Sequence, residues 1–529
     1  MKKRITTILL NSWPYFIGLA VGLVFSTFNI IGFPIEYYPG DLGDARFNMY
    51  VLEHAHQFFT GDVDSYWDAG FMYPMENMMS WSDNLLGTAP IYSFLRLIGM
   101  SRELAFSSWF LILVILNYST AYLFLRKLLG NKYAAPIGAM IFAFSVGLQS
   151  QLVHAQTYPR FAIPLAMLFA LYFYWELKVK FLILSVFMVV YQFYCGIYLG
   201  LMLGTMMIIT FLVLFILKRK EIWEKLKQWK WTLGVTLGIV LALLILMPLM
   251  LPYMSSESEG YPLADVLHSV PTIKSYLYGQ HGTIGWEFLS RTAEDYPAPW
   301  AHQIFPGGLA ILGVVIITSV FIHNQFKKHS WFSQKLKKEY LLFFISGLVT
   351  LLFFLKIGDF TLYQFIYKIP GYISVRAVQR IINVEMIFFA FAVGLLVWLI
   401  LEKWGRKDVL IFILFIGIIV VDNYQDAKFV SRTSHSFANQ ELTYLRSKMK
   451  YIPEGTVVSY EPEVLEYNSL VYHISAMLVA QEYHLKCVNG YTSKSPEGYW
   501  IYSVEPNEVN RNYWLEFKDS KADTVYIVH

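Results

Sequence analysis

Long apolar runs follow one another along the chain, and short polar segments rich in lysine and arginine separate them. A run of about twenty apolar residues can cross a bilayer as a helix, because a helix satisfies its own backbone hydrogen bonds in lipid. The pattern predicts about eleven transmembrane helices, at residues 14–33, 104–125, 134–150, 161–176, 181–196, 197–217, 231–252, 304–323, 341–356, 381–401 and 409–423. Residues 85–100 are also apolar but contain Pro90 and Arg96, which favours an interfacial or re-entrant helix, with a twelfth span as the alternative.

Basic residues predict how these helices are oriented. Lysine and arginine are concentrated in one alternating set of segments, at 1–4, 126–132, 178–180, 218–230, 327–338 and 403–407. Such loops stay on the cytoplasmic side of a membrane. No small-residue cleavage site follows the first apolar run, so we expect a retained first helix with its N-terminus in the cytoplasm. An odd number of spans then places residues 424–529 outside.

The composition excludes a string of soluble domains. Hydrophobic residues make up 56% of the 529 residues and charged residues only 15%, whereas soluble proteins average about 25% charged. The net charge of +4 is divided among loops and forms no single basic footprint, so we expect no nucleic-acid partner. The two cysteines, Cys195 and Cys487, are too few for a disulfide framework and have no metal-ligand spacing.

We therefore predict an all-α polytopic membrane protein with a small α/β extracytoplasmic C-terminal domain. The membrane module covers residues 1–423, including the outer loops 34–103 and 253–303. Short β-like runs, such as 456–459, predict the α/β domain over residues 424–529. No internal repeat is visible, which weakens a transporter interpretation.

The first outer loop carries candidate catalytic acids. Asp41 and Asp44 open a predicted helix, and Asn48 shares a face with Asp44 at helical spacing. Helix capping explains one of the two aspartates equally well. Asp83 has the same two interpretations, as a functional acid or as the N-cap of the helix at 85–100. Capping does not explain why these acids stand beside the membrane surface.

Further polar residues stand at the outer ends of later spans. His154, Gln156 and Arg160 lie between two spans, where polar groups need partners near lipid. A lone histidine in such a place is more often structural than catalytic. Arg376 and Arg380 are four residues apart and are expected to lie on one helical face. Two guanidinium groups there could clamp a phosphate, or could anchor the helix to lipid headgroups.

These positions belong to a series of motifs that extends along the chain, namely Asp41-x-x-Asp44-x-x-x-Asn48, Tyr73-Pro74, Ser82-Asp83-Asn84-Leu85-Leu86-Gly87, His154-Ala155-Gln156 before Pro164-Leu165, Phe305-Pro306-Gly307, Pro370-Gly371 with Arg376 and Arg380, and Asn489-Gly490-Tyr491. In order and topological place the series resembles the GT-C-type integral membrane glycosyltransferases, which depend on polyprenyl-phosphate sugars. The similarity is to a poorly characterised bacterial branch. The chain departs from that pattern at Ala377 and at His54, where an aromatic residue is common.

The resemblance implies transfer of a sugar from a polyprenyl-phosphate-linked donor to a glycan, lipid or protein acceptor. Transfer would occur on the outer face of the bacterial cytoplasmic membrane, normally with inversion. The general base would be Asp44 or Asp41. The donor phosphate would be bound by Arg376, Arg380, Arg160 and His154. The acceptor or sugar pocket would contain Asn48, Asp83, Gln156, Tyr296, Trp300 and His302, of which the last three lie in a loop that either folds over the donor or anchors in the interface.

A divalent cation such as Mg²⁺ or Mn²⁺ is a further implication of the resemblance. Asp41, Asp44 and Asp83 could hold it, although the sequence contains no tight ligand motif. Two other classes of function remain as alternatives: a polyprenyl-lipid or glycan transporter or flippase, and a non-catalytic protein of envelope assembly. A transporter would place ionisable residues at mid-membrane depth on broken helices, whereas the spans here are mostly apolar.

Overall fold

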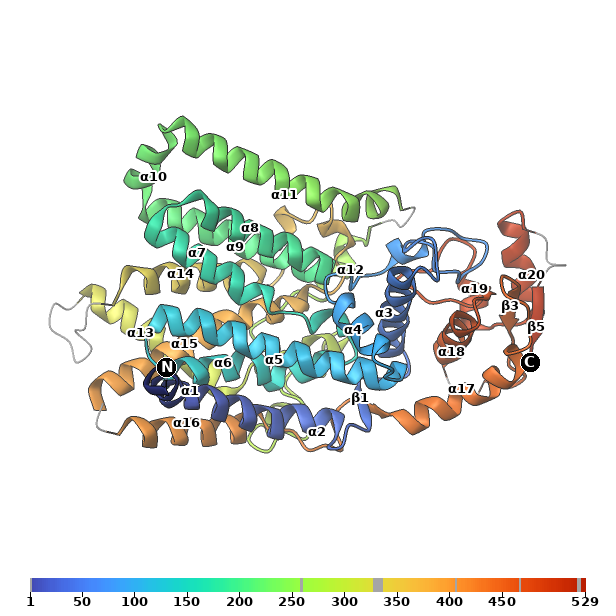
Figure 1. Cartoon of the computed structure of the whole chain (residues 1–529), viewed down its shortest axis with the longest axis horizontal. Coiled ribbons are helices and arrows are strands. Elements are labelled where there is room, and N and C mark those ends of the chain that lie inside the picture. Colours follow the sequence, from blue (N-terminus) through green and yellow to red (C-terminus); the bar gives the residue numbers. More distant parts are fainter. Residues whose placement is uncertain (1, 257–259, 327–335, 405–406, 466–467, 521–524) are drawn as a thin grey trace.

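The structure is a computed structural model and describes residues 2–256, 260–326, 336–404, 407–465, 468–520 and 525–529. Long helices run side by side along the longest axis, and a small domain containing the C-terminus lies at one end of them (Figure 1). The predicted basic loops fall partly outside the described residues, at 327–335 and 405–406.

Each predicted span coincides with helix. The helices of the membrane body are α1 (Lys2–Gly22), α2 (Phe28–Ile31), α5 (Arg102–Leu129), α6 (Ala134–Phe144), α7 (Ala162–Glu176), α8 (Val179–Cys195), α9 (Ile197–Leu217), α11 (Trp229–Ser255), α13 (Gly308–Phe326), α14 (Lys338–Phe354), α15 (Ile382–Trp404) and α16 (Asp408–Asn423). A π-helical turn joins α1 to α2. Within the described residues, five helical segments are long and apolar enough to cross a membrane. The count of eleven crossings stays a prediction.

Two expected segments differ from the sequence prediction. The span expected at 134–150 ends as α-helix at Phe144, because the Ser145 hydroxyl donates to the Pro306 carbonyl at 2.7 Å and the next amide donates to Asn423. The apolar segment 85–100 forms only a nine-residue helix, α4 (Ala89–Leu97). Nine residues are too few to cross a bilayer, so the alternative of a twelfth span there is wrong.

Helix α15 forms the centre of the body. It packs against α6, α13 and α14. In the most apolar stretch of this helical segment 89% of the residues are buried inside the protein, whereas in that of α11 only 17% are buried. A helix that is apolar all round suits either a protein core or lipid. The two helices therefore occupy opposite environments: α15 is enclosed by protein, and α11 has an apolar surface that faces outward for most of its length.

The polar elements gather mainly at one end of the body (Figure 1). Those before residue 424 are β1 (Tyr37–Pro39), α3 (Asp44–Thr60) and α12 (Leu263–Leu267), whereas α10 (Arg219–Leu226) lies at the opposite end of the body (Figure 1). The C-terminal elements are β2 (Arg432–Ser434), α17 (His435–Met449), β3 (Val457–Tyr460), α18 (Ser469–Glu482), β4 (Lys486–Cys487), α19 (Trp500–Val504), α20 (Glu508–Phe517) and β5 (Val525–Val528). A parallel sheet of order β4-β3-β5 gives residues 424–529, called the tail below, their α/β character. In a second sheet β1 pairs antiparallel with β2.

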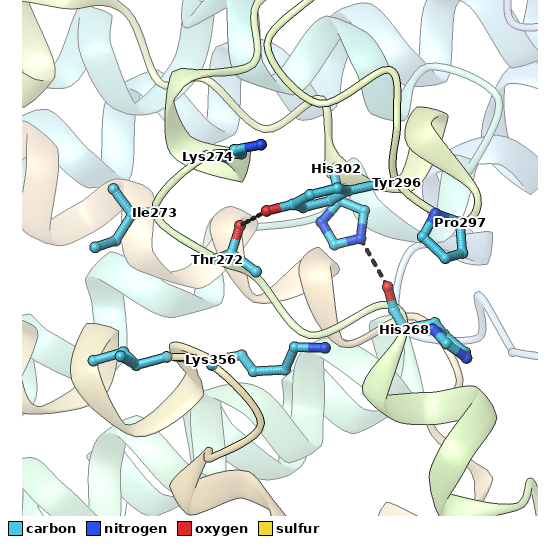
Figure 2. Close-up of a pocket in the computed structure, with 10 residues that line it drawn as sticks. His268, Thr272, Ile273, Lys274, Tyr296, Pro297, His302 and Lys356 are labelled. Carbon is cyan, nitrogen blue, oxygen red and sulfur yellow. Dashed lines mark hydrogen bonds between the residues drawn. The ribbon is translucent and has the colours of Figure 1, made fainter.

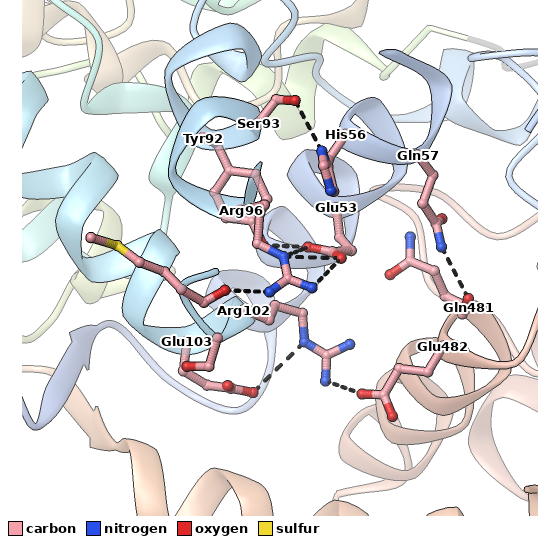
Figure 3. Close-up of polar contacts among 12 residues, drawn as sticks. Glu53, His56, Gln57, Tyr92, Ser93, Arg96, Arg102, Glu103, Gln481 and Glu482 are labelled. Atoms are coloured by element: carbon pink, nitrogen blue, oxygen red, sulfur yellow. Dashed lines mark hydrogen bonds and ion pairs between the residues drawn. The ribbon is translucent and has the colours of Figure 1, made fainter. Parts of the chain in front are cut away.

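Two ion pairs lie where the C-terminal elements meet α3, α4 and α5 (Figure 3). Arg102, at the start of α5, donates to Glu482 at the end of α18 at 2.7 Å, and its own side chain is 6% exposed. Arg96 of α4 binds both carboxylate oxygens of Glu53 on α3, and Tyr92 donates to the same carboxylate at 2.6 Å. The Arg102–Glu482 pair joins residues 424–529 to the membrane body, whereas the Glu53 contacts join α3 to α4.

Candidate active site

Asp44 is the first residue of α3 and follows a turn that Asp41 holds. Asp41 Oδ1 accepts hydrogen bonds from the backbone amides of Gly43 at 3.1 Å and Ala45 at 3.2 Å. Asp41 Oδ1 therefore binds the first backbone amides of the helix, as a capping group does, although the N-cap residue of α3 is Gly43. The carboxylate of Asp44 is left for other partners, and the N-terminal end of α3 favours its negative charge.

Two side chains from distant parts of the chain meet the Asp44 carboxylate. Tyr491 donates its hydroxyl to Oδ1 at 2.6 Å, across 447 residues of sequence. His154 Nδ1 lies 3.1 Å from Oδ2. The side chains of Asp44 and His154 keep 30% and 24% of their exposure, so the carboxylate is largely enclosed but still reachable from solvent.

The charge state of this pair follows from its surroundings. Burial raises the pKa of Asp44, but the contacts with His154 and Tyr491 and the charge of Arg380 outweigh it and bring the pKa below its ordinary value. Burial and the charge of Arg380 lower the pKa of His154. At pH 7 an ionised Asp44 therefore faces a neutral imidazole.

Arg376 and Arg380 do not share a helical face, so this part of the sequence prediction is wrong. The Ser269 hydroxyl donates to the Arg376 carbonyl and accepts from the Val378 amide at 3.0 Å. These two bonds hold the backbone in an irregular turn, and α15 begins only at Ile382. The two arginines extend from this turn, which we call the arginine turn (residues 376–380).

Each guanidinium group lies over an aromatic ring. Arg376 is 5.5 Å from the ring centre of Tyr261, and Arg380 is 5.1 Å from that of Tyr198. Stacking holds a guanidinium group in place and leaves its N–H edge for a ligand. The positive charge of Arg380 acts on Asp44, and that of both arginines acts on His154. The structure thus brings together the predicted acid and the predicted phosphate-binding charges.

Asp83 adds a second buried carboxylate and does not cap α4, whose N-cap is Thr88. Its Oδ1 accepts from the Ile197 amide at 2.6 Å, at the start of α9, and burial raises its pKa to about 6. Gly196 allows Asp83 and Gln156 to come close together. A Cβ atom on that glycine would lie 3.0 Å from the Gln156 carbonyl oxygen and 3.6 Å from Asp83 Oδ2.

Several buried polar atoms of this region have no hydrogen-bond partner in the described part of the chain. They include Asp83 Oδ2, Gln156 Oε1 and Arg380 Nε, and also His154 Nδ1, which approaches Asp44 at ion-pair distance without hydrogen-bond geometry. Buried polar atoms in native proteins are nearly always hydrogen-bonded. Two acceptors and one donor without partners indicate a place for a polar ligand that both donates and accepts hydrogen bonds.

Two other predicted residues, Asn48 and Arg160, hold the backbone of the site in place. Asn48 donates to the Asp44 carbonyl at 2.7 Å, so its amide acts within α3. Arg160 is 5% exposed and donates to Asn383 at 3.2 Å, and Asn383 in turn donates to the Arg380 carbonyl at 2.9 Å. Arg160 therefore braces the arginine turn.

The predicted residues of the second outer loop lie around a separate cavity (Figure 2). Tyr296 and His302 line it, whereas Trp300 is 72% exposed and does not. Both ring nitrogens of His302 are engaged, one with the Ser275 hydroxyl at 2.7 Å and the other with the His268 carbonyl at 2.7 Å. His302 therefore has a structural role, and neither of the two side chains that contact the Asp44 carboxylate belongs to this loop.

The described aspartates do not fit a divalent cation. No cluster of three His, Cys, Asp or Glu side chains suited to a metal ion occurs among the residues that the structure describes. Asp41 binds backbone amides, Asp44 is engaged by Tyr491 and His154, and Asp83 Oδ1 binds the start of α9. The three aspartates predicted as metal ligands thus bind different partners and do not converge on one site.

Sequence reasoning missed three aromatic members of the site. Tyr491 belongs to the Asn489-Gly490-Tyr491 motif, so its position carried a signal although no role was assigned to it. Tyr198 and Tyr261 stack on the arginines, and nothing distinguishes them in a chain with 37 tyrosines. Stacking partners of this kind depend on tertiary structure alone.

No protein-family model and no curated protein matches the sequence. Solved structures of an oligosaccharyltransferase from Archaeoglobus fulgidus are similar in fold. AglB in complex with an inhibitory peptide and a dolichol-phosphate aligns with a TM-score of 0.52 and 11% identity, over 97% of this chain and 69% of that one. The apo form aligns with a TM-score of 0.51 and 9% identity, over 97% of this chain and 69% of that one. The complex with Zn and sulfate aligns with a TM-score of 0.51 and 10% identity, over 96% of this chain and 67% of that one.

The chain has the GT-C fold. The alignment covers nearly all of it, so the likeness includes both the membrane body and the outer elements. The predicted GT-C-like architecture is confirmed at this level. Oligosaccharyltransferases are glycosyltransferases of this fold, but identities of 9 to 11% relate the folds alone.

Proposed function

We propose that the protein is a membrane glycosyltransferase that uses a polyprenyl-phosphate-linked sugar donor and transfers the sugar to an acceptor hydroxyl or amide. The reaction takes place on the extracytoplasmic face of the bacterial cytoplasmic membrane, with the N-terminus inside and the tail outside. The observation that carries this proposal is that the positive charge of Arg380, in the arginine turn, acts on an ionised Asp44 at one end of an apolar helical body.

Asp44 acts as the general base. It removes the proton from the acceptor while the acceptor atom attacks the anomeric carbon of the sugar, and the carbon–oxygen bond to the phosphate breaks. A single displacement of this kind inverts the anomeric centre. A base with a lowered pKa remains suitable, because it is fully ionised at pH 7 and its geometry is held by Tyr491 and His154.

Arg376 and Arg380 receive the leaving polyprenyl phosphate, which carries away the electron pair of the broken bond. Positive groups held in place before the reaction stabilise this developing charge without reorganisation. The unpartnered atoms of Asp83, Gln156 and Arg380 suit sugar hydroxyl groups, which both donate and accept. The dolichol-phosphate complex of AglB supports a lipid-linked donor by analogy of fold.

Sugar transfer by the purified, reconstituted chain tests the proposal. Polyprenyl-phosphate sugars extracted from a bacterial envelope serve as donors, and release of polyprenyl phosphate is measured together with transferred sugar. Asp44→Asn is expected to lower the rate about 10²–10⁴-fold, the usual contribution of a general base. Asp41→Asn is the matched control, three residues away, and keeps the rate. Unchanged transfer by Asp44→Asn contradicts the assignment, and lipid translocation without transfer supports a flippase instead.

A further inference from the structure

A cavity of about 410 Å³ lies apart from Asp44, between residues 268–274, 296–302 and 356–358 (Figure 2). Cavities of this size hold small ligands or the headgroup of a larger one. Neither arginine of the arginine turn lines it. The cavity wall nevertheless continues into that turn, because His268 is followed by Ser269, whose hydroxyl binds the Arg376 backbone.

The cavity is positively charged. Lys274 and Lys356 extend toward it from opposite sides of the Thr272–Tyr296 pair (Figure 2). Lys356 donates to the Leu267 carbonyl at 3.0 Å and forms no ion pair with a carboxylate of the described residues. Lys274 has Asp295 at 3.7 Å, but both side chains are more than half exposed. An exposed pair at this distance contributes little, so Lys274 remains able to bind an anion.

The polar lining is already in place. The Thr272 and Tyr296 hydroxyl groups are 3.1 Å apart, and the Thr272 hydroxyl also contacts that of Ser275 at 3.2 Å. His302 fixes two walls of the cavity to each other through its bonds to Ser275 and the His268 carbonyl. A preformed site loses little ordering entropy when a ligand binds.

The rim of the cavity is apolar and exposed. Ile273 and Ile357 are each 62% exposed, and Phe360 close to Ile357 in sequence is 53% exposed. Helix α14 ends at Phe354, two residues before Lys356, so the rim stands at the end of a membrane-body helix. Lysines beside exposed apolar side chains at such a level favour a ligand with an anionic head and an apolar part.

We propose that this cavity is a second phosphate-binding site, which takes a phosphate-bearing ligand between Lys274 and Lys356 and an apolar portion of it against Ile273 and Ile357. The phosphate oxygens accept from the two ammonium groups, beside the Thr272–Tyr296 pair. The ligand is either a lipid with a phosphate headgroup or a soluble phosphate compound, because both present the same group to the lysines. The proposal needs no sugar transfer and stands apart from the role of Asp44.

Binding to the purified full-length chain tests this site. The Arg376→Gln/Arg380→Gln variant is used so that the arginine turn contributes no signal. Short-chain phosphatidic acid is the lipid probe, the corresponding diacylglycerol is its phosphate-free control, and inorganic phosphate is the soluble probe. We expect phosphatidic acid to bind and diacylglycerol not to bind. Comparable binding of inorganic phosphate identifies a soluble source, and its absence identifies a lipid headgroup.

Substitution of the lysines locates the binding. Adding Lys274→Gln/Lys356→Gln is expected to weaken phosphatidic acid binding at least tenfold, whereas Lys368→Gln, an exposed lysine of the same outer region that does not line the cavity, has no effect. Equal affinity after the double lysine substitution overturns the proposal. Failure of both phosphate probes to bind more tightly than diacylglycerol overturns it as well. The probe comparison needs no folded lysine variant. Loss of transfer in Asp44→Asn with binding intact separates this site from the proposed function.

Discussion

Removing the Tyr491 hydroxyl is expected to change the pKa of the proposed base, Asp44, while the Asp44 carboxylate itself stays in place. Tyr491→Phe deletes the 2.6 Å hydrogen bond to Asp44 Oδ1 and keeps the ring, which packs edge-on against Phe47. A hydrogen bond to a charged acceptor contributes about 1.5–3 kcal/mol. The Asp44 side chain is 30% exposed, so water partly replaces the hydroxyl and the lower figure applies. About 1.5 kcal/mol corresponds to roughly one pKa unit, so we expect the pKa of Asp44 to rise by about one unit.

The pH profile of sugar transfer measures this change. The acid limb of kcat/KM reports the base in the free enzyme, and Tyr491→Phe is expected to move that limb upward by about one unit. Removing the second contact as well, in His154→Ala/Tyr491→Phe, leaves burial as the main influence on Asp44 and moves the limb further upward. The matched control is Tyr513→Phe, because Tyr513 is an exposed tyrosine of the same domain.

Thermal unfolding gives a second readout that needs no substrate. Because the pKa of Asp44 is lowered in the folded state, its contacts add stability above the ordinary pKa, and this stability is lost as the pH falls. The difference in melting temperature between wild type and Tyr491→Phe should therefore shrink on acidification. Superimposable pH profiles of wild type and Tyr491→Phe, or an equal shift in Tyr513→Phe, would refute the reasoning.

Three further predictions concern neighbouring contacts. Asp41→Ala should keep transfer but cost about 1 kcal/mol of stability, measured as a lower melting temperature, since Asp41 accepts hydrogen bonds from the backbone. Asp83 has a pKa raised by burial from 3.8 to about 6, so stability from its neutral form is present below pH 3.8 and is lost as the pH rises through 6. Asp83→Asn should then gain melting temperature relative to wild type across that window, and parallel curves would contradict the buried charge. Glu482→Gln should cost about 2 kcal/mol and speed tryptic cleavage of the tail, because it weakens the bond to Arg102, whereas the exposed Glu508→Gln should not.

The membrane body was largely predictable from the sequence. The long apolar runs, separated by basic loops, predicted the positions of the helices of the body. A helix in lipid must satisfy its own backbone hydrogen bonds, so each crossing needs a long apolar run that is visible in the sequence. Breaks such as the one at Ser145 were not predictable, since they depend on hydrogen bonds to Pro306 and Asn423, which are remote in sequence. For the same reason the segment 85–100 gave a short helix, held by Arg96 on Glu53.

The candidate site was predictable in part. Its charged members were identified because an acid or an arginine beside an apolar span is conspicuous, and Asp44, His154 and Arg380 do come together. Their arrangement was not predictable. Spacing placed Arg376 and Arg380 on one helix, but a single serine, Ser269, binds the backbone between them and prevents it. Aromatic partners escaped notice because tyrosines are too common in a membrane protein to stand out.

A structure of the protein with a bound polyprenyl-phosphate sugar tests the central claim most directly. The account predicts a phosphate within hydrogen-bonding distance of the Arg376 or Arg380 guanidinium group, with the anomeric carbon directed toward the Asp44 carboxylate. A donor phosphate bound away from both arginines, or a sugar separated from Asp44 by packed side chains, would contradict it.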